Sequence, residues 1–192
     1  MNTFAKVDRE TFRRFAAEHP EQRYELERGR IVQQMTGGTR RHGIVARRIA
    51  QLIEDQIDSS RWTVLTDRGV GIGPSSRNAD VVVEPSSEPL DSLETEHPAM
   101  IVEVLSPTTS GTDLNTKPGE YLSLSTLDAY LVASQVEAAM LLWTRGPDGQ
   151  FPENGREIDG VGQSITICGR GFTVTIPFVE VYRGIVGPEA TS

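Results

Sequence analysis

The chain has 192 residues, of which 37% are hydrophobic and 24% charged, and its formal net charge is −8. This composition is that of an ordinary globular protein and excludes a disordered chain, and no apolar run approaches the roughly 20 residues that a membrane-spanning helix needs. The first ten residues lack a basic region followed by an apolar stretch, which a secretion signal would show. We therefore expect one cytoplasmic domain, residues 1–192, with no membrane partner. Cys168 is the lone cysteine, and we expect it to pack in a late strand.

The acidic charge is distributed unevenly. Residues 1–60 carry 11 Lys and Arg against 9 Asp and Glu, whereas residues 61–192 carry 8 against 18. A local basic cluster in the first part consists of Arg40, Arg41, His42, Arg47 and Arg48. Such a cluster is compatible with a helix start that contacts phosphates and equally with a solvated helical face.

The first third of the chain predicts two helices and a hairpin. Apolar residues at helical spacing predict a short helix over 8–19 and a long one over 40–56. Between them, the extended segments 24–27 and 30–33 flank Arg28-Gly29, and a glycine there provides the positive φ of a tight turn.

The rest of the chain predicts mainly strands. The predicted elements are strands at 62–66, 79–84 and 100–105, a surface loop over 85–98, a helix over 115–125, strands at 129–133 and 139–144, and short strands at 165–168 and 172–176. Within the single domain we expect a core over about residues 20–145 and a terminal β extension over residues 146–192. The mixture of helices and strands indicates an α/β fold class.

Two carboxylates lie in strands that are predicted to be buried. Glu103 has apolar neighbours on both sides in Met100-Ile101-Val102-Glu103-Val104-Leu105, and Asp80 precedes three consecutive valines. A buried charge without a partner costs several kcal/mol, so each carboxylate needs a cation, hydrogen-bond donors or a metal. If the two strands are neighbours, Asp80 and Glu103 converge at one sheet edge. Two carboxylates with water and phosphate oxygens suit Mg²⁺, or Mn²⁺ in its place.

Lys117 stands out by composition, because Lys6 and Lys117 are the only lysines among 19 basic residues. An ammonium group is a compact charge that can orient a water molecule or stabilise a phosphoryl transition state. A single retained lysine can also be an accident of an arginine-rich composition. Pro118 follows it directly, and proline is tolerated only in the first turn of a helix, so the helix is expected to begin at Asn115 or Thr116.

These residues resemble a known family. The segment Ala79-Asp80-Val81-Val82-Val83, then Ile101-Val102-Glu103-Val104-Leu105-Ser106-Pro107-Thr108, then Asp113, Lys117 and Tyr121, resembles the Uma-two family of restriction-endonuclease-like proteins, a branch of the PD-(D/E)XK nuclease superfamily. Tyr24-Glu25-Leu26 with Gly29, His42, and Asp128-Ala129-Tyr130-Leu131-Val132 extend the resemblance over about residues 20–145. Ala79 stands where the motif has its proline.

The resemblance implies a restriction-endonuclease-like fold, with a central mixed sheet flanked by helices. It also implies a metal-dependent endonuclease that hydrolyses nucleic-acid phosphodiesters, with DNA as the expected substrate. It implies Asp80 and Glu103 as ligands of Mg²⁺ or Mn²⁺ and Lys117 as the catalytic lysine, since Leu105 occupies the usual lysine position. The expected accessory residues are Arg41, His42 and Tyr121 at the substrate and Glu25 in an outer shell. Glu25, His42 and Tyr121 equally fit structural roles in the hairpin, the helix start and the core.

Two other interpretations stay open at this stage. The net charge of −8 and Pro118 favour a catalytically inactive nuclease fold that binds nucleic acid or protein. Alternatively, Lys117 neutralises Asp80 and Glu103 in a buried ion-pair network without metal. A homodimer would suit cleavage of both strands of a duplex, but no interface is evident from the residues.

Overall fold

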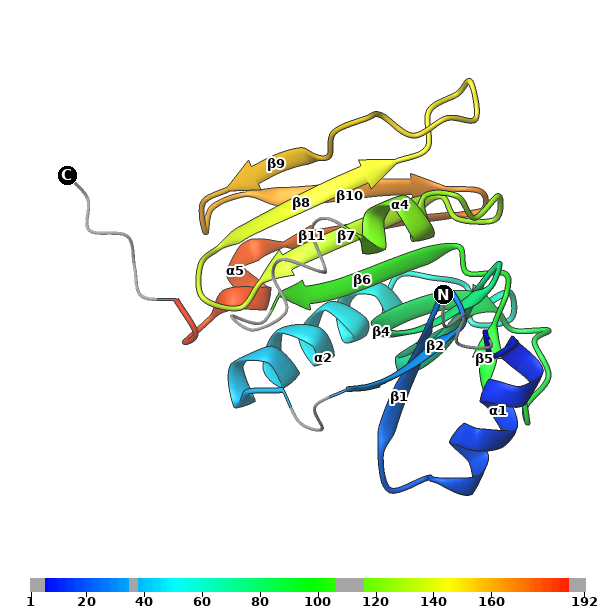
Figure 1. Ribbon diagram of the computed structural model, residues 1–192. Helices are drawn as coiled ribbons and strands as arrows, with labels where there is room; N and C mark the ends of the chain where they lie inside the picture. Colours follow the sequence, from blue (N-terminus) through cyan, green and yellow to red (C-terminus); the bar gives the residue numbers. More distant parts are fainter. Residues whose placement is uncertain (1–5, 35–37, 106–115, 187–192) are drawn as a thin grey trace.

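A computed structural model describes residues 6–34, 38–105 and 116–186. In this part of the chain nine strands form one mixed sheet, namely β1 (Arg23–Glu27), β2 (Arg30–Gln34), β3 (Trp62–Ile72), β4 (Ser75–Pro85), β5 (Glu94–Thr95), β6 (Met100–Leu105), β7 (Ala129–Ser134), β8 (Ala139–Thr144) and β9 (Arg156–Asp159). The strands follow the order β2-β1-β4-β6-β7-β8-β9, with β3 paired to β4 and β5 paired to β3 (Figure 1). The predicted fold class, a mixed sheet flanked by helices, is confirmed.

The remaining elements flank this sheet. They are α1 (Arg9–Glu18), α2 (Arg40–Glu54), α4 (Lys117–Tyr121) and α5 (Phe178–Tyr182), with a separate hairpin of β10 (Ser164–Gly169) and β11 (Phe172–Pro177). Helix α2, α5 and the β10–β11 hairpin cover one face of the sheet, whereas α4 lies on the other (Figure 1). The sheet therefore has a hydrophobic cluster on each side.

The N-terminal predictions are confirmed with shifts of one or two residues. Asp8 caps α1 through the N–H of Thr11, as a carboxylate at that position commonly does. The predicted hairpin forms between β1 and β2, and both Arg28 (φ 48°) and Gly29 (φ 89°) adopt the positive φ of a tight two-residue turn. Thr39 is the N-cap residue of helix α2, and its hydroxyl accepts a hydrogen bond from the N–H of His42.

The hairpin of β3 and β4 is about twice as long as the sequence predicts. The unpredicted halves, 67–72 and 75–78, are rich in glycine, serine and charged residues, which have weak β propensity. They are nevertheless strands, because their polar groups find partners: Arg68 pairs with Glu84 at 3.1 Å, and Ser76 donates to Glu94 at 2.6 Å. The predicted loop over 85–98 likewise contains β5, which pairs in parallel with β3.

Residues 146–186 contribute more to the fold than a simple extension would. Strand β9 joins the main sheet beside β8, and α5 packs with α2 and β10–β11 in one hydrophobic cluster. Neither β9 nor α5 is predicted from the sequence. The expectation for Cys168 is wrong: strand alternation in β10 buries Ile165 and Ile167 and leaves Cys168 exposed.

The predicted helix over 115–125 is shorter in the structure. Helix α4 spans five residues, and Pro118 lies in its first turn, where the missing N–H has no partner to lose. Part of the family motif, Ser106, Pro107, Thr108 and Asp113, lies outside the described residues. Among the described helices, none combines the length and the apolar character that crossing a membrane requires.

Candidate active site

Strand β4 pairs with β1 near its start and with β6 farther along, and β1 and β6 diverge from each other. We call the place where they diverge the fork, and the candidate site lies there. Residues 81–83 of β4 pair with β6, whereas Ser76 pairs with Leu26 of β1. Between these two contacts, the backbone of β4 is held by side chains: Glu25 accepts the N–H of Asn78 at 3.0 Å. The last pair of β4 and β6 joins Val81 to Val102, so Asp80 and Glu103 lie directly beyond it on the two strands. Both carboxylates act electrostatically on His42, which places the two predicted residues in one neighbourhood.

The carboxylate of Asp80 lies between the start of α2 and the backbone of β6. Its Oδ2 accepts the N–H of Val104 at 2.7 Å, a contact that replaces a backbone partner where β4 leaves β6. The same oxygen is 3.1 Å from Nε2 of His42. The hydrogen bond with Asp80 raises the pKa of His42 although burial opposes it, and the negative charges of Asp80 and Glu103 add to the effect. His42 is therefore more readily protonated than a free histidine.

The carboxylate of Glu103 is buried in the middle of the sheet with polar donors from α4. The residue is 3% exposed, and its Oε1 accepts hydrogen bonds from Lys117 Nζ and Tyr121 Oη, each at 2.9 Å. Lys117 and Tyr121 are four residues apart and thus one turn apart on α4. Burial raises the pKa of Tyr121 well above its usual value, and nearby Glu103 adds to this, so the phenol stays protonated and donates.

The other predicted site residues lie at different distances from this centre. Glu25 is buried in β1, where it accepts hydrogen bonds from Arg77, Gln34 and the N–H of Asn78, so its contacts reach Asp80 only through β4. Arg41 lies in the first turn of α2 with an exposed side chain. The structure thus brings Asp80, His42, Glu103, Lys117 and Tyr121 together and sets Glu25 and Arg41 at the margin.

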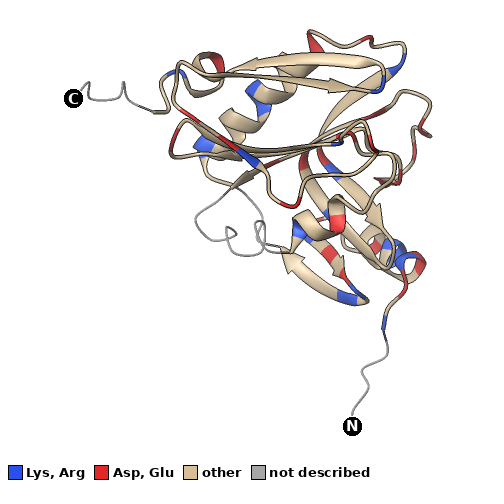
Figure 2. Ribbon diagram, turned by 90° about the horizontal axis from the view of Figure 1, so that it is seen from above, with Lys and Arg blue, Asp and Glu red and all other residues tan. Residues whose placement is uncertain are grey.

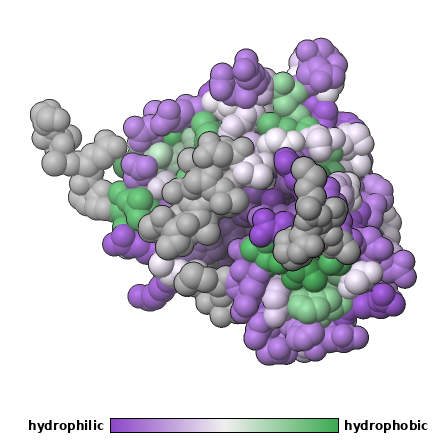
Figure 3. Space-filling model, viewed as in Figure 1, coloured by the Kyte–Doolittle hydropathy of each residue, from purple (hydrophilic) through white to green (hydrophobic). Residues whose placement is uncertain are grey.

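The surface around the site is polar without being broadly basic. In the view of Figure 2, basic and acidic residues are interspersed along the described ribbon. The face of the molecule in Figure 3 is hollowed at its centre, where hydrophilic residues gather. The chain as a whole is acidic and therefore repels nucleic acid at long range. Binding of nucleic acid here would have to depend on local cationic groups.

The donor set suits a hard cation that keeps part of its water shell. Among the described residues no group of three His, Cys, Asp and Glu side chains is placed to hold a metal ion. Asp80 and Glu103 on neighbouring strands supply two carboxylates, and Mg²⁺ characteristically binds through one or two carboxylates, water and substrate phosphates. The residues therefore fit Mg²⁺ and do not fit a closed structural metal such as four-coordinate Zn²⁺.

Sequence reasoning missed one group of residues beside this site. Arg77 in β4 is 1% exposed and contacts three carboxylates, those of Glu25, Glu27 and Glu120. The sequence signal that could have revealed this group is Arg77 itself, a charged residue two positions before the predicted strand that begins at Ala79. Strand alternation continued backwards from Ala79 would have given Arg77 the same inward direction as that alanine.

The architecture defines the class of protein, a domain with the restriction-endonuclease-like fold. Among solved structures, a protein from Anabaena variabilis ATCC 29413, described as a "putative nuclease", is similar to this chain with a TM-score of 0.66 and 15% identity over 84% of this chain and 90% of that one. The Uma2 family model, described as "Putative restriction endonuclease", matches residues 9–168, and the chain belongs to this family. No curated protein matches the chain.

Proposed function

We propose that this protein is a divalent-metal-dependent endonuclease that hydrolyses phosphodiester bonds, with DNA as its substrate. The observation that carries the proposal is the convergence of Asp80, Glu103 and Lys117 at the fork of β4, from three separate segments of the chain. The family to which the chain belongs supports a nuclease, and its description as a restriction endonuclease supports DNA.

In the proposed mechanism, Asp80 and Glu103 would hold Mg²⁺ or Mn²⁺. When bound, the metal supplies polarisation of the scissile phosphate and a lower pKa for the attacking water. Lys117, already 2.9 Å from Glu103, places its ammonium group where it orients that water and balances charge on the phosphoryl group. Tyr121 restrains the Glu103 carboxylate through its hydroxyl hydrogen bond.

The marginal residues receive supporting roles. His42, whose pKa is raised, and exposed Arg41, both in the first turn of α2, are proposed to contact the phosphates of the substrate strand. Glu25 acts from behind the site, because it holds the backbone of β4 at Asn78, two residues before Asp80. The spacing of the metal ligands then depends on Glu25 without direct coordination.

A cleavage assay tests the proposal. Supercoiled plasmid, labelled single-stranded DNA and labelled RNA are incubated with Mg²⁺, Mn²⁺ or chelator, beside the variants Glu103→Ala and Lys117→Ala. We expect cleavage of DNA that requires metal, is abolished in Glu103→Ala, and falls by about 10²- to 10³-fold in Lys117→Ala, the range for loss of one group that stabilises charge in a transition state. Direct linearisation of plasmid would indicate that two sites act together in a dimer.

The chain offers a matched control for the lysine. Lys6 is its only other lysine and is exposed, so Lys6→Ala removes the same positive charge from the surface. Its cleavage rate should stay close to that of the wild type. Preferential cleavage of RNA would correct the substrate, whereas metal-dependent cleavage that survives in Glu103→Ala would reject the assigned site.

The contacts of the two carboxylates favour a second candidate, a nuclease fold that binds nucleic acid without cleaving it. Asp80 already contacts His42 and Val104, and Glu103 already contacts Lys117 and Tyr121, so protein groups stabilise both charges. Calorimetric titration with Mg²⁺ and Mn²⁺ separates the candidates. Binding that disappears in Asp80→Asn supports the nuclease, and no binding by the folded wild type supports the second candidate.

A further inference from the structure

Helix α4 carries two side chains of the site but is too short to hold itself in place. It spans five residues, whereas isolated helices shorter than about 12 residues are marginal in water. Its N-cap residue, Thr116, makes no side-chain capping hydrogen bond, and Gly119 lies within it. Its position therefore depends on contacts that its side chains make with the sheet. One of these contacts comes from Glu120, which lies between Lys117 and Tyr121 in sequence.

Glu120 is bound to a buried arginine at the base of the fork. Its Oε2 accepts from Arg77 Nε at 2.7 Å, and its Oε1 is 3.3 Å from the hydroxyl of Ser75. The other side of the guanidinium reaches β1, because Nη1 donates to Glu25 at 2.9 Å and to Glu27 at 2.6 Å. Arg77 thus joins three elements, β1, β4 and α4, through one side chain. We refer to Arg77, Glu25, Glu27 and Glu120 as the Arg77 cluster.

The Arg77 cluster is rigid for electrostatic reasons. The side chain of Arg77 is 1% exposed, and burial by itself would lower the pKa of the guanidinium. The hydrogen bonds to Glu120 and Glu27 and the charge of Glu25 outweigh burial and raise that pKa above its ordinary value. A planar guanidinium also fixes the direction of each partner, which a lysine ammonium would not do. Glu120 is therefore held at a defined place beside β4.

We propose that Arg77 and Glu120 are positioning residues that fix α4, and with it the Lys117 ammonium, against Glu103. Arg77 is three residues before Asp80 on β4, so the same strand sets both the aspartate and the anchor of the helix. The catalytic consequence rests on the proposed nuclease function, because it assumes that the placed ammonium takes part in cleavage. The placement itself is a property of the fold and can be measured without substrate.

Two variants separate positioning from charge balance. Glu120→Ala and Glu27→Ala each remove one carboxylate from the same guanidinium and leave it two others. Only Glu120→Ala removes a contact between α4 and the sheet, since Glu27 lies in β1. Alanine is the strongest helix former, so Glu120→Ala does not weaken α4 through intrinsic helix propensity. The difference between the two variants thus reports on the anchoring of α4.

The first measurement is of the lysine itself. The chain has two lysines, so protein labelled with ¹³C at lysine gives two Cε–Hε signals, and a Lys6→Arg variant assigns them. Spectra are recorded in the presence of chelator. Buried Lys117 beside Glu103 should have a signal distinct from that of exposed Lys6. In Glu120→Ala the Lys117 signal should move toward the Lys6 position, and in Glu27→Ala it should stay in place.

The second measurement is cleavage kinetics under the metal condition at which the wild type is active. Displacement of a reacting group by about 1 Å can reduce the rate by about 100-fold. We expect kcat of Glu120→Ala to fall by about that factor with little change in KM, and kcat of Glu27→Ala to stay within about twofold of the wild type. Glu120→Gln retains an oxygen that can accept from Arg77 and should recover part of the lost rate.

The two measurements test the positioning role and the nuclease function separately. If the wild type cleaves no substrate, the proposed function fails, and the lysine spectra still decide whether Glu120 positions Lys117. An unmoved Lys117 signal in Glu120→Ala, or equal shifts in both alanine variants, would overturn the positioning role. If Glu120→Ala does not fold, the spectra of Glu120→Gln against Glu27→Gln replace the comparison, and a larger displacement of Lys117 in Glu120→Gln remains the expected result.

Discussion

The buried carboxylate of Glu103 depends on two side chains that donate hydrogen bonds to it. Glu103 is 3% exposed, and an unpaired carboxylate there would cost several kcal/mol. Lys117 and Tyr121 supply a charged and a neutral donor to the same oxygen. Tyr121 thus adds a hydrogen bond to the buried Glu103 carboxylate without adding charge.

Removal of the Tyr121 hydroxyl should destabilise the fold without emptying the core. In Tyr121→Phe the buried ring remains and Glu103 loses one donor, so we expect the free energy of unfolding to fall by about 1.5–3 kcal/mol, the range for hydrogen bonds to charged groups. Urea denaturation measures the loss. Tyr24→Phe is the control, because that hydroxyl bonds to the exposed side chain of Gln22 and its removal should change stability by less than about 0.5 kcal/mol. Equal losses in both variants would contradict the assigned role.

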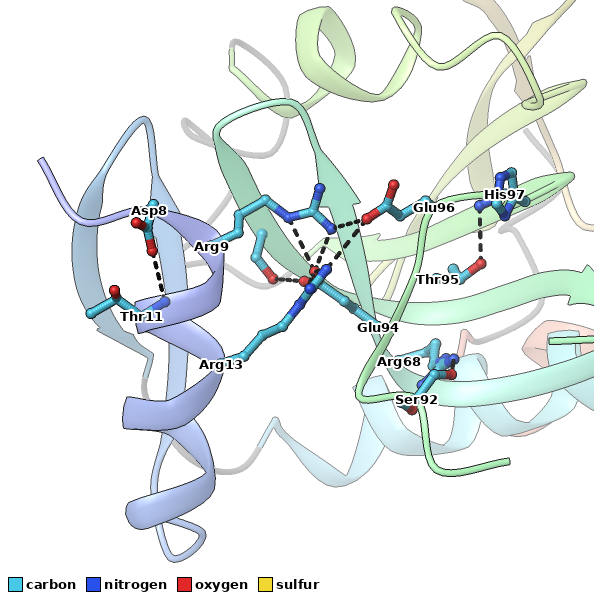
Figure 4. A network of polar contacts seen from close by, with 11 residues as sticks. Asp8, Arg9, Thr11, Arg13, Arg68, Ser92, Glu94, Thr95, Glu96 and His97 are labelled. Atoms are coloured by element: carbon cyan, nitrogen blue, oxygen red, sulfur yellow. Dashed lines mark hydrogen bonds and ion pairs between the residues drawn. The ribbon is translucent and has the colours of Figure 1, made fainter. Parts of the chain in front are cut away.

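Single elements are docked by ion pairs as well as by apolar contacts. Helix α1 has Phe12 as its buried residue, and two of its arginines, Arg9 and Arg13, point to the carboxylate of Glu94 in β5 (Figure 4). Glu94 also accepts the hydroxyl of Ser76 at 2.6 Å. Burial by itself would raise the pKa of Glu94, but the hydrogen bonds from Ser76, Arg9 and Arg13 outweigh burial and lower it. Glu94 is therefore charged in the folded protein at neutral pH.

This arrangement predicts a pH-dependent contribution to stability. A carboxyl group with a lowered pKa in the folded state stabilises the fold above its unfolded pKa and loses that contribution as the pH falls through the folded pKa. Glu94→Gln should therefore lower the free energy of unfolding by about 1–3 kcal/mol at pH 7. The difference from the wild type should shrink as the pH falls below the ordinary glutamate value of 4.5.

Denaturant titrations at several pH values measure that difference. Glu96→Gln is a suitable control, because Glu96 contacts the same two arginines but its side chain is 54% exposed, so its pairs should contribute less than about 1 kcal/mol. A difference between Glu94→Gln and wild type that grows on acidification would contradict the assigned sign.

At the scale of the whole molecule, the C-terminal residues are part of the main core. Phe178 and Val181 of α5 are fully buried in the cluster that contains Ile49 of α2 and Val102 of β6. In addition, Arg48 of α2 donates to the carbonyl of Val181 at 2.8 Å. Since these contacts join residues more than 130 positions apart, α2 and the C-terminal helix α5 should unfold together.

Truncation of the α5 side chain should therefore destabilise the whole fold. We expect Phe178→Ala to cost about 3–5 kcal/mol, the range for deletion of a buried phenylalanine, with circular dichroism and tryptophan fluorescence giving the same urea midpoint. Val179→Ala on the same helix is the control, because Val179 is 52% exposed and its truncation should cost less than about 0.5 kcal/mol. An early transition confined to one probe in Phe178→Ala would instead show that residues 146–186 unfold separately.

The sequence predicts an element well when the element contains a long apolar pattern of its own. Helix α2 and strand β6 were predicted closely, because their apolar residues repeat at 3.6 positions or run without interruption. Strand β9 and helix α5 were missed, because each has five residues or fewer and too short a pattern to distinguish from a loop. The family resemblance supplied the fold class, which the periodicity of separate elements would not have specified.

The sequence by itself determined the chemistry of the candidate site: carboxylates in two apolar strands and a lysine in an arginine-rich chain. Only the tertiary structure decided their partners, because a buried charge is satisfied by groups that are distant in sequence. Arg77 contacts Glu25, 52 positions earlier, and Glu120, 43 positions later, and His42 contacts Asp80 across 38 positions. A local pattern cannot encode these pairings, since they depend on how β1, β4 and α4 meet at the fork.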